Sequence, residues 1–344
     1  MPNPNEGLVT IHLLIYNHRH LLRDCIESVL SQDYPDIEFI LSDNNSSDGS
    51  AEFIEKSYPG LTLVRNPENL GYSRAHNRVI RATSGAYFMP LNPDAVLSPG
   101  YARELVRAVG MDRSVGMATG KLYRNAERII DSTGMYFTPA LRHLDRGSDE
   151  PDHGQYGRWE FVFGVSGAAP LFKREMLEDV QVLGEPFDAD FFAYREDADL
   201  CWRAQLMGWK AVYAPAATAL HARAVLPSNR RHLPAEINLH SVKNRFLMRV
   251  KNLTRGVFWK TFPFFILRDV LIAGYILLFE QTSMKAVPLF FRALPAALRK
   301  RRIIMRKKAV TEAYLSRWFD WIPRTEPVRD AGLSEDAPGR TESP

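Results

Sequence analysis

The side chains of this chain that are best suited to chemistry lie in two acidic turns, about a hundred residues apart. The first turn, with Asn92 and Asp94, ends an apolar run, and the second, with Glu196 and Asp197, opens a segment of helical pattern. A carboxylate at the end of a strand can bind a hard divalent cation. A carboxylate at the start of a helix can accept a proton from a reacting group. The two turns together predict a metal-assisted group transfer.

Two further polar turns follow predicted strands and would lie at the same edge of a sheet. Residues 16–18 contain Tyr16 and Asn17, and residues 43–49 contain Asp43. Because open α/β sheets bind ligands at the carboxyl ends of their strands, these turns and the first acidic turn could bind a nucleobase, a ribose and a metal diphosphate. For any one turn alone, the simpler explanation is that its Asn and Asp side chains satisfy backbone groups.

The elements that must position these turns alternate between strand and helix patterns, with the period of about thirty residues that βαβ units require. The pattern predicts strands at 9–16, 37–41, 61–64 and 87–91 and helices at 21–30, 72–82 and 99–109, with Asp48 and Ser98 as helix caps. We therefore expect an α/β fold with a mostly parallel sheet covered by helices.

The pattern weakens over 121–159, which predicts loops and short strands over one end of the sheet. It returns with a strand at 168–172, a helix at 195–207 that Gly208 ends, and a strand at 210–213. These limits predict a first domain at 1–225. Cys25 and Cys201 fall at apolar helix positions, which favours buried thiols in a reducing compartment, and hence a cytosolic location, over a disulfide.

Residues 226–310 are predicted to form a helical region associated with a membrane. The stretch 258–279 is long enough to span a bilayer, but Arg268 and Asp269 lie at its middle, where each charge costs about 2.5 to 3.5 kcal/mol. We therefore expect a helix pair lying in the interface, with the seven Lys and Arg residues of 299–308 over anionic headgroups. The alternative is a helical cap packed on the domain with a solvated charged end. Residues 311–344 are predicted to be a disordered tail.

Other classes of protein fit the sequence less well. The net charge of +4 comes from the local cluster at 299–308, which lacks interleaved aromatic residues and so suits a membrane surface better than a nucleic acid. No G-x-G-x-x-G follows the first strand, which argues against a nicotinamide-dependent enzyme, and no P-loop motif is present. The first residues lack the basic and apolar regions of a secretory signal, so export is not expected.

The ordered set of motifs resembles glycosyltransferase family 2 over roughly residues 8–223. The motifs lie at 15–17, 43–49, 69–72 with Asn77, 91–94, and 191–200 with Arg203 and 208–209. The resemblance implies a GT-A fold and inverting chemistry. The chain is most similar to the rhamnosyltransferase-type enzymes of bacterial cell-wall and O-antigen assembly.

The resemblance also implies roles for single residues. Tyr16 and Asp43 would hold the pyrimidine base of a UDP- or dTDP-sugar. The full donor-binding set implied is Tyr16, Asn17, Asp43, Asn45, Asn69, Gly71, Asn77 and Asn92. Gly71 also has a local reason, because a backbone close to a ligand tolerates no Cβ; the alternative is a turn glycine at the entry of the helix.

On the metal side, Asp94 matches the last acid of the family's D-x-D motif, whereas Asn92 replaces the first acid. Asp94 and His221 would hold Mg²⁺ or Mn²⁺, and one carboxylate suffices when donor phosphates and water complete the shell. A histidine that ends a strand is also commonly a packed residue.

On the acceptor side, Asp197 would be the general base, because inversion requires a carboxylate to take the proton of the attacking hydroxyl. The segment 164–168 would line the acceptor pocket, and Ser166, Gly167, Glu196 and Arg203 form the implied acceptor-binding set. Arg203 could also pair with Asp199 on the helix surface.

Together these inferences predict an inverting, metal-dependent glycosyltransferase at the cytoplasmic face of the inner membrane. It would use a nucleotide-sugar donor and a glycan or polyprenyl-linked acceptor, without a nucleic-acid partner. The alternatives are a sugar-nucleotide-binding protein that has lost catalysis, which the Asn92 replacement would suggest, and a basic nucleic-acid-binding protein.

Overall fold

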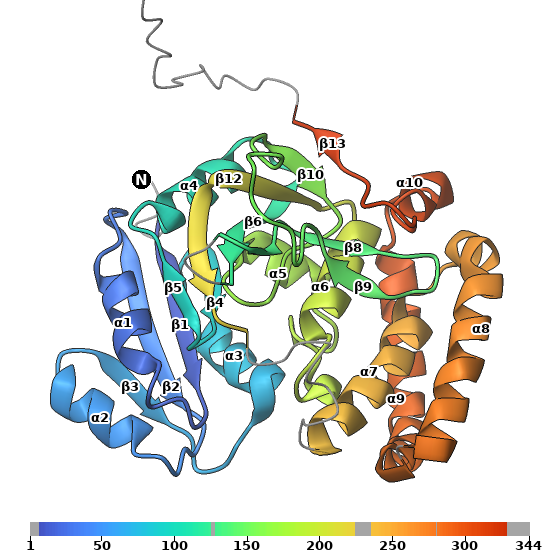
Figure 1. Ribbon diagram of the computed structural model, residues 1–344, viewed down its shortest axis with the longest axis horizontal. Helices are drawn as coiled ribbons and strands as arrows, with labels where there is room; N and C mark the ends of the chain where they lie inside the picture. The colour runs from blue at the N-terminus through green and yellow to red at the C-terminus, as the bar shows by residue number, and fades with distance from the viewer. Residues whose placement is uncertain (1–6, 125–127, 224–234, 280, 329–344) are drawn as a thin grey trace, which may run out of the picture.

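A large mixed sheet with helices on both faces organises the computed structural model, which describes residues 7–124, 128–223, 235–279 and 281–328 (Figure 1). The strand order is β13-β10-β12-β6-β11-β4-β1-β2-β3, with β5 beside β12 and β7 beside β6, and β8 and β9 form a separate hairpin. The strands are β1 (Val9–Ile15), β2 (Ile37–Asp43), β3 (Thr62–Arg65), β4 (Tyr87–Leu91), β5 (Ala95–Leu97), β6 (Val115–Tyr123), β7 (Ile130–Ser132), β8 (Met135–Phe137), β9 (His143–Asp145), β10 (Glu160–Val162), β11 (Leu171–Lys173), β12 (Lys210–His221) and β13 (Glu326–Pro327). The predicted α/β fold with a mostly parallel sheet is confirmed.

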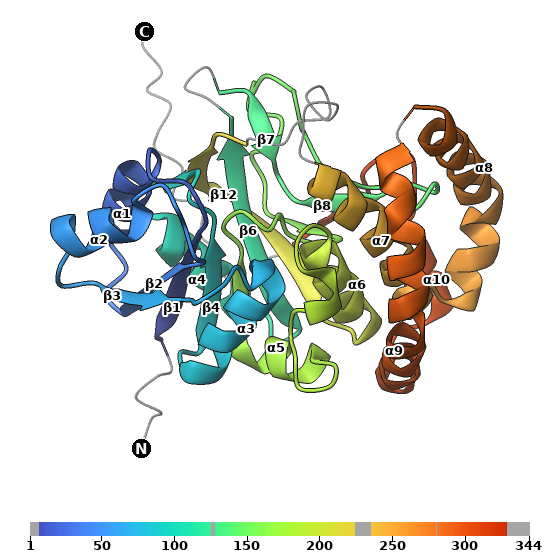
Figure 2. The same ribbon diagram turned by 90° about the horizontal axis from the view of Figure 1, so that it is seen from below.

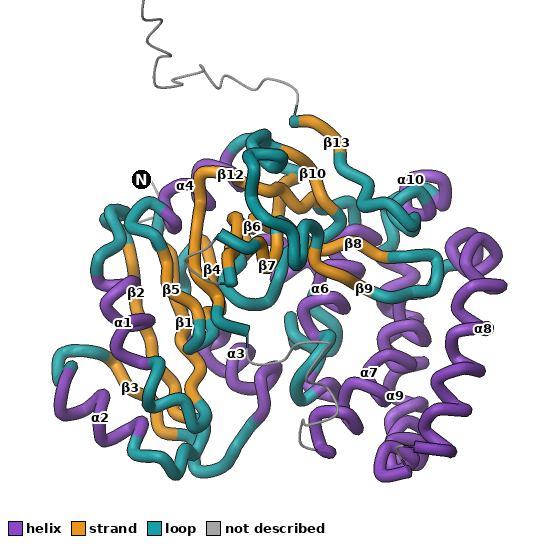
Figure 3. Tube along the Cα trace, in the orientation of Figure 1, coloured by secondary structure: helices purple, strands orange, loops and turns teal. Residues whose placement is uncertain are grey.

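The helices fall into two groups along the chain (Figure 3). Those of the sheet domain are α1 (Leu22–Leu30), α2 (Ser50–Ser57), α3 (Gly71–Ala82), α4 (Tyr101–Gly110), α5 (Arg174–Val180), the short 3₁₀ helix η1 (Ala189–Phe191) and α6 (Glu196–Leu206). Those that follow are α7 (Ala235–Asn252), α8 (Arg255–Phe279), the 3₁₀ helix η3 (Gln281–Lys285), α9 (Ala286–Lys307) and α10 (Glu312–Ser316).

Alternation of side chains along the strands builds a hydrophobic core on each face of the sheet. Val9, Ile11 and Leu13 of β1 point to one face, where they pack with the apolar stripes of α1 and α4. Val79 and Ile80 of α3 join α5 and α6 in the core of the other face. Figure 2 shows the two layers of helices with the sheet between them.

The local predictions succeed where the apolar pattern is strong. Strand β4 has the predicted bounds. The predicted Asp48 cap is off by one residue, because Gly49 is the N-cap of α2, although Asp48 Oδ1 accepts a hydrogen bond from Ser50 N at 3.1 Å. The predicted Ser98 cap is wrong, because α4 begins at Tyr101 and only the backbone carbonyl of Ser98 contacts its first N–H, at 3.0 Å.

Strand β6 has no counterpart among the predicted strands, and β12 is much longer than predicted. All nine residues of β6 are buried, so no alternation marks it, and Gly116 and Gly120 weaken its strand pattern. Both glycines are required by close packing, because a Cβ on Gly116 would lie 2.5 Å from the Met176 side chain.

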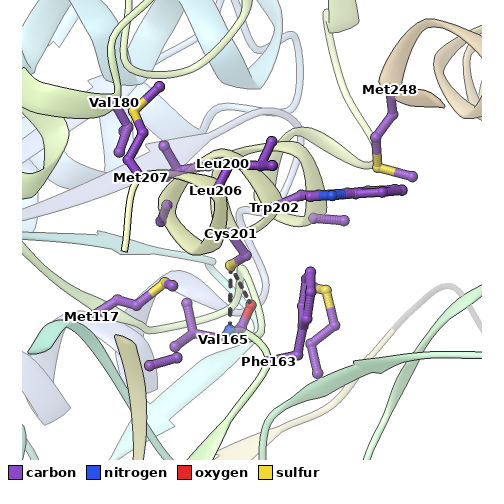
Figure 4. Close-up of a cluster of buried hydrophobic side chains, with 14 of the residues drawn as sticks. Met117, Phe163, Val165, Val180, Leu200, Cys201, Trp202, Leu206, Met207 and Met248 are labelled. Carbon is purple, nitrogen blue, oxygen red and sulfur yellow. Dashed lines mark hydrogen bonds between the residues drawn. The ribbon is translucent and has the colours of Figure 1, made fainter. Parts of the chain in front are cut away.

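The helices after residue 235 share a core with the sheet domain. Leu247 and Met248 of α7 and Ile304 of α9 are buried in the same cluster as Trp202 of α6. Figure 4 shows Met248 beside Trp202 in this cluster. The region is therefore packed on the sheet domain, as the alternative of a helical cap predicted.

Part of the basic cluster at 299–308 is used inside the protein, which corrects the expectation for those residues; Arg299, Arg302 and Arg306 are exposed, and for them the contact with anionic headgroups stays a prediction. Lys300 is buried and donates to Asp188 at 2.5 Å and Asp190 at 2.8 Å, and Arg301 donates to the carbonyl of Val250 at 3.0 Å. Lys307 pairs with Asp179 and Lys308 with Glu312.

The charges at the middle of α8 are turned toward the protein. Asp269 pairs with both Nη atoms of Arg249 at 2.5 and 2.8 Å, and Arg268 donates to the carbonyl of Ala140 at 3.1 Å. The outward side chains are apolar, including Leu267, Val270 and Leu271. By length and composition α8 is the one described helix that could cross a membrane, with a mean hydropathy of 1.9 and 6% of that stretch buried.

The predicted disordered tail is wrong for its first part. Residues 312–316 form α10, and β13 pairs with β10 at the edge of the sheet. Trp318 and Phe319 are buried in the core cluster that contains Trp202, which explains why this segment is ordered. Residues 329–344 lie outside the described part of the chain.

Candidate active site

The predicted donor turns lie side by side at the carboxyl ends of β1, β2 and β4. Ile15 pairs with Asp43 and Leu13 with Leu91 in parallel register, so the turns that follow these strands meet at one rim of the sheet. Tyr16 is 45% exposed on this rim. The rim thus brings an accessible aromatic ring beside the carboxylates expected to bind a donor.

The turn after β2 leaves one buried carboxylate oxygen without a protein partner. Asp43 Oδ2 accepts from Ser46 N at 3.1 Å, whereas Oδ1 is buried and has no hydrogen-bond partner among the described residues. Asn17 and Asn45 adopt left-handed backbone (φ 59° and 67°), and Asn17 Oδ1 accepts from Ser47 N at 2.8 Å. Asn17 therefore fixes the turn, and Asp43 keeps an acceptor for a ligand N–H.

The loop before α3 has a structural reason for each of its predicted residues. Asn69 Oδ1 accepts from Asn44 Nδ2 at 2.8 Å and from Gly71 N at 2.9 Å, which holds the loop and the helix start. Gly71 has φ +72°, and a Cβ there would lie 2.5 Å from the Phe192 ring. The glycine is thus required by its left-handed backbone and by Phe192, rather than by the ligand contact that the sequence suggested.

Asn77 and Arg203 are used within the protein. Asn77 exchanges two hydrogen bonds with the backbone of Phe187, at 2.6 and 3.0 Å. Arg203 is buried, pairs with Asp199 at 3.0 Å and donates to the carbonyls of Val180 and Pro186. The predicted pair with Asp199 forms, but in the core and not on the helix surface. Neither side chain has a free group for a substrate, so we drop both from the binding sets.

The two predicted metal ligands lie next to each other. Strand β5 pairs with β12 so that Ala95 faces His221, and His221 Nε2 lies 3.4 Å from Asp94 Oδ1. His221 Nδ1 lies 2.8 Å from Asp131 Oδ2. Although burial opposes protonation, the hydrogen bonds to Asp131 and Asp94 raise the pKa of His221 to about 9.

Asp131 is a buried partner of His221 that the sequence analysis did not single out. It lies on the three-residue strand β7 and is fully buried, where it also pairs with Arg124 at 3.1 Å and Arg223 at 3.2 Å. A carboxylate that orients a metal-binding histidine is a recurrent arrangement. No local motif marks Asp131, because its partners come from β12 and from the residues that follow β6 and β12.

Backbone contacts join the Asp94 turn to the predicted general base. Asn92 N donates to the carbonyl of Ala168 at 2.9 Å, and the preceding Gly167 N donates to Asp197 Oδ2 at 3.2 Å. A Cβ on Gly167 would lie 3.1 Å from that same oxygen, so a small residue is needed for this close approach. Ser166 is buried in the same segment. Asp94 and Asp197 thus flank one short segment at the carboxyl end of the sheet.

Helix α6 packs against this segment through Cys201. Cys201 Sγ lies 3.4 Å from Val165 N, the contact drawn in Figure 4, and a Cβ on Gly164 would lie 2.7 Å from the Cys201 side chain. Cys201 and Cys25 are both free and buried, as predicted.

The two acidic residues at the start of α6 have different surroundings. Burial raises the pKa of Asp197, and hydrogen bonds from Ala198 N and Gly167 N oppose this shift. Burial and the nearby Asp197 raise the pKa of Glu196 well above its usual range, and Glu196 Oε2 has no partner in the described structure. The surroundings therefore favour the protonated form more strongly for Glu196 than for Asp197, so that Asp197 is the more readily ionised of the two acids.

The loop before these acids is strained. Phe192, Tyr194 and Arg195 are non-glycine residues in left-handed backbone, with φ of 60°, 69° and 74°. Such residues persist only where the surrounding structure holds them, and they cluster at functional sites. Asn244 of α7 provides this support, because its Nδ2 lies 2.8 to 2.9 Å from the carbonyls of Phe191, Ala193 and Tyr194.

Replacing Asn244 by Leu should therefore lower kcat by about 10- to 100-fold, because the buried carbonyls lose a hydrogen-bond donor worth about 1 to 3 kcal/mol. The KM for the donor should change little, since the hydrogen bonds of Asn244 to described residues all go to this loop and none to the donor rim. Steady-state kinetics with thermal melting would check this expectation.

Asn252→Leu is the matched control, because Asn252 is a buried asparagine of the same helix that bonds Asp199 Oδ1 at 2.8 Å. Equal losses of kcat in the two variants would mean that general destabilisation, and not loop positioning, explains the effect.

These features define a class of protein: a GT-A-type glycosyltransferase with polar turns, an Asp–His pair and a partly buried acid at one end of its sheet. The chain belongs to glycosyl transferase family 2, whose family model matches residues 10–180. The resemblance expected from the sequence is thus confirmed for the family and the fold.

Curated relatives cover parts of the chain. It is 32% identical over 117 residues to an uncharacterized protein of Mycobacterium tuberculosis, spanning 34% of this chain but only 36% of that relative. It is 28% identical over 228 residues to the N-acetylglucosaminyl-diphospho-decaprenol L-rhamnosyltransferase of the same bacterium, spanning 60% and 72% of the two chains.

Among solved structures, the fold is similar to a mannosyltransferase from Pyrobaculum calidifontis in complex with GDP-Man and Mn²⁺. The TM-score is 0.51 at 21% identity, over 89% of this chain and 84% of that chain. This similarity covers more of the chain than the family match at residues 10–180, and it supports the fold alone.

Proposed function

We propose that this protein is an inverting, divalent-metal-dependent glycosyltransferase of cell-envelope glycan synthesis. It transfers a sugar, with rhamnose the first candidate, from a UDP- or dTDP-sugar to a lipid-linked or polysaccharide acceptor. The contacts from Asn92 through Ala168 and Gly167 to Asp197 carry this proposal, because they bring the Asp94 turn and the partly buried carboxylate of Asp197 to one segment.

The Asp94–His221 pair fits a divalent cation. Mg²⁺ and Mn²⁺ commonly take one or two protein carboxylates, and imidazole is a further ligand for Mn²⁺. Asp131 contacts Nδ1 of His221, so the other ring nitrogen, Nε2, faces Asp94. No cluster of three or more metal-binding side chains occurs among the described residues, so phosphate and water oxygens would supply the other ligands. Mg²⁺ or Mn²⁺ bound here would neutralise the diphosphate as it departs.

The chain's own residues bind the donor and move a proton. Tyr16 stacks on the pyrimidine base, and the unpartnered Oδ1 of Asp43 accepts from the ring N–H. Asp197 takes the proton of the acceptor hydroxyl as that oxygen attacks C1 from the face opposite the diphosphate. Gly167 N holds the carboxylate of Asp197 in place during this transfer.

The acceptor class is supported by a relative. The mycobacterial rhamnosyltransferase named above acts on a sugar linked through diphosphate to decaprenol, according to its name. We therefore favour a lipid-linked acceptor over a soluble glycan.

Titration of the full chain with a panel of sugar nucleotides, with and without Mn²⁺, tests the proposal. Saturable binding of a UDP- or dTDP-sugar, with transfer to a lipid-linked acceptor, is expected. Binding without transfer to any acceptor would favour a sugar-nucleotide-binding protein, and absence of binding would overturn the proposal.

We further propose that α8 seats the protein on the cytoplasmic face of the membrane. Its exposed residues include Leu267, Leu271 and Leu278, while its two central charges bond to Ala140 and Arg249 inside the protein. This arrangement suits a helix that lies in the interface with its apolar face in the lipid.

The double substitution Leu267→Glu with Leu271→Glu should lower binding to lipid vesicles by at least about a hundredfold, since each exposed leucine contributes roughly 1.5 to 3 kcal/mol when buried. Cosedimentation with vesicles measures the effect. Leu30→Glu, an exposed leucine of α1, is the matched control. Undiminished cosedimentation of the double variant would exclude α8 as the seat.

A further inference from the structure

Helix α3 begins between the donor turns and the loop that leads to the predicted base. Figure 1 and Figure 2 both show α3 between strands β1 and β2 on one side and helix α6 on the other. On the donor side, Asn44 Nδ2 donates to Asn69 Oδ1 at 2.8 Å, and Asn44 Oδ1 accepts from Leu70 N at 3.2 Å. Because Asn44 directly follows Asp43, the start of α3 is fixed to the turn that is expected to bind the nucleobase.

Tyr72, in the first turn of α3, holds two segments on the acceptor side. Its backbone N–H donates to the carbonyl of Phe192 at 2.7 Å, and its hydroxyl donates to the carbonyl of Gly167 at 3.1 Å. Gly167 N in turn donates to Asp197 Oδ2 at 3.2 Å. One residue thus contacts both the loop that precedes Asp197 and the segment that holds its carboxylate.

The contact with Phe192 falls on a strained part of this loop. Phe192 has φ 60° and ψ −67°, and Ala193 N donates to the carbonyl of Phe191 at 2.7 Å, which together form the rare type of γ-turn. Such backbone persists only where other contacts hold it. The first N–H groups of a helix need acceptors, so the bond from Tyr72 N satisfies the helix start and also fixes the strained turn.

The ring of Tyr72 is held by a buried polar chain that leads back to the donor strand. Its centroid lies 4.2 Å from that of His76, and His76 Nδ1 lies 2.8 Å from His12 Nδ1 in β1. His12 Nε2 lies 2.9 Å from Oγ of Ser42, the residue before Asp43. Burial lowers the pKa of His12 to about 3 and that of His76 well below its usual range, so both imidazoles are neutral. The packed ring directs the hydroxyl of Tyr72 toward Gly167.

We propose that Tyr72 is a positioning residue of the transfer reaction, which holds the Gly167 segment and so keeps the carboxylate of Asp197 in place relative to the bound donor. It acts through Gly167, whose carbonyl accepts its one hydroxyl proton. This inference rests on the proposed function and adds a residue to the base side of the site.

The Tyr72→Phe variant removes only the hydroxyl and keeps the ring that packs on His76. Because one neutral hydrogen bond is lost and neither bond of Tyr72 goes to a donor turn, kcat should fall about 3- to 10-fold while the KM for the sugar nucleotide stays within about twofold. Tyr213→Phe is the matched control, since Tyr213 is a buried tyrosine whose hydroxyl donates to the carbonyl of Tyr156 at 2.8 Å. Wild-type kcat in Tyr72→Phe, or an equal loss in Tyr213→Phe, would overturn the proposal.

The dependence on Asp197 separates positioning from a general effect on stability. If Tyr72 acts through the carboxylate, Tyr72→Phe should cause no further loss in the Asp197→Asn background, because the group that it positions is already absent. A general structural effect would lower the residual activity of that background by the same factor as in wild type. The same factor in both backgrounds therefore contradicts the proposal.

NMR titration of the carboxyl carbon of Asp197 tests the link without turnover, with the signal assigned by its absence from Asp197→Asn. Burial raises the pKa of Asp197 and the hydrogen bond from Gly167 N opposes this shift, so a weaker bond in Tyr72→Phe should raise the pKa further. The substitution changes no charge. The other ionisable groups near Asp197, all left in place, are Glu196, Asp145 and Arg223. Equal pKa values of Asp197 in wild type and Tyr72→Phe would overturn the proposal.

Failure of this inference and failure of the proposed function give different results. If wild type transfers no sugar to any acceptor, the proposed function is rejected, whereas the NMR titration still decides whether Tyr72 holds Asp197. If wild type transfers sugar and Tyr72→Phe equals it in kcat, only the inference about Tyr72 is rejected.

Discussion

The Asp197→Asn variant should retain sugar-nucleotide binding and lose about 10²- to 10⁴-fold in turnover, the range that general-base catalysis contributes. The substitution is nearly isosteric, and the amide oxygen of Asn can still accept from Gly167 N, which bonds Asp197 Oδ2 at 3.2 Å in the wild type. The segment 164–168 should thus stay in place while the group that takes the proton is lost.

The pH dependence of the wild-type enzyme provides a second readout of the same group. Burial raises the pKa of Asp197, so the base is protonated, and activity falls, at a higher pH than for an ordinary aspartate. The acid limb of kcat/KM should therefore lie above the usual range for Asp, and it should disappear from the residual activity of Asp197→Asn.

Two comparison variants test the assignment of Asp197 as the general base. Glu55→Gln removes an exposed carboxylate of α2 that pairs with Arg65, and it should behave as wild type. Glu196→Gln tests the neighbouring acid, whose pKa burial and Asp197 raise well above its usual range. If Glu196→Gln loses the larger factor in turnover, the base is Glu196 and the assignment of Asp197 is wrong.

The sequence predicts the sheet and the rim because local patterns encode both. Strand β4 is an apolar run that ends at a polar turn, and the parallel pairing of β1, β2 and β4 brings three such turns together. Asp94 and His221 were also predicted as a pair, and they lie 3.4 Å apart because β5 pairs with β12.

Residues whose partners are distant in sequence could not be predicted in this way. Asp131 comes from a three-residue strand, and only the folded sheet brings it to His221, 90 residues away. Asn244 supports the strained loop from a helix more than 50 residues away. The structural roles of Asn77 and Arg203 could not be predicted for the same reason, since both donate to backbone carbonyls of the 180–187 segment.

The charged C-terminal region shows how composition misleads when the fold is unknown. Asp269 and Arg268 argue against a place in the membrane only if they face lipid, and both face the protein instead. Lys300 was counted toward an exposed basic surface, yet it is buried between Asp188 and Asp190. The distribution of charge over the faces of a helix, and not its total, decides how that helix meets a membrane.

The Asp94→Asn variant should lose about 10²- to 10³-fold in activity and most of its affinity for Mn²⁺, because a metal that stabilises the departing diphosphate is worth several kcal/mol. Binding of Mn²⁺ alone, followed by electron paramagnetic resonance, measures the second effect without turnover. Asp131→Asn should weaken Mn²⁺ binding by a smaller factor, about 10- to 100-fold, since it orients His221 without touching the ion. Asp33→Asn, an exposed carboxylate that pairs with Arg103, is the matched control.

The relative activities of these variants, with and without EDTA, show whether a bound metal ion or a protonated His221 supplies the positive charge beside Asp94. In the metal-free protein, Asp131 and Asp94 raise the pKa of His221 to about 9, so a protonated imidazole already lies beside Asp94 at neutral pH. If that imidazolium replaces the metal, activity should survive EDTA, and Asp131→Asn should harm the metal-free enzyme because it lowers the pKa of His221. If the metal is required, EDTA should reduce wild type to the level of Asp94→Asn, and added Mn²⁺ should restore wild type alone.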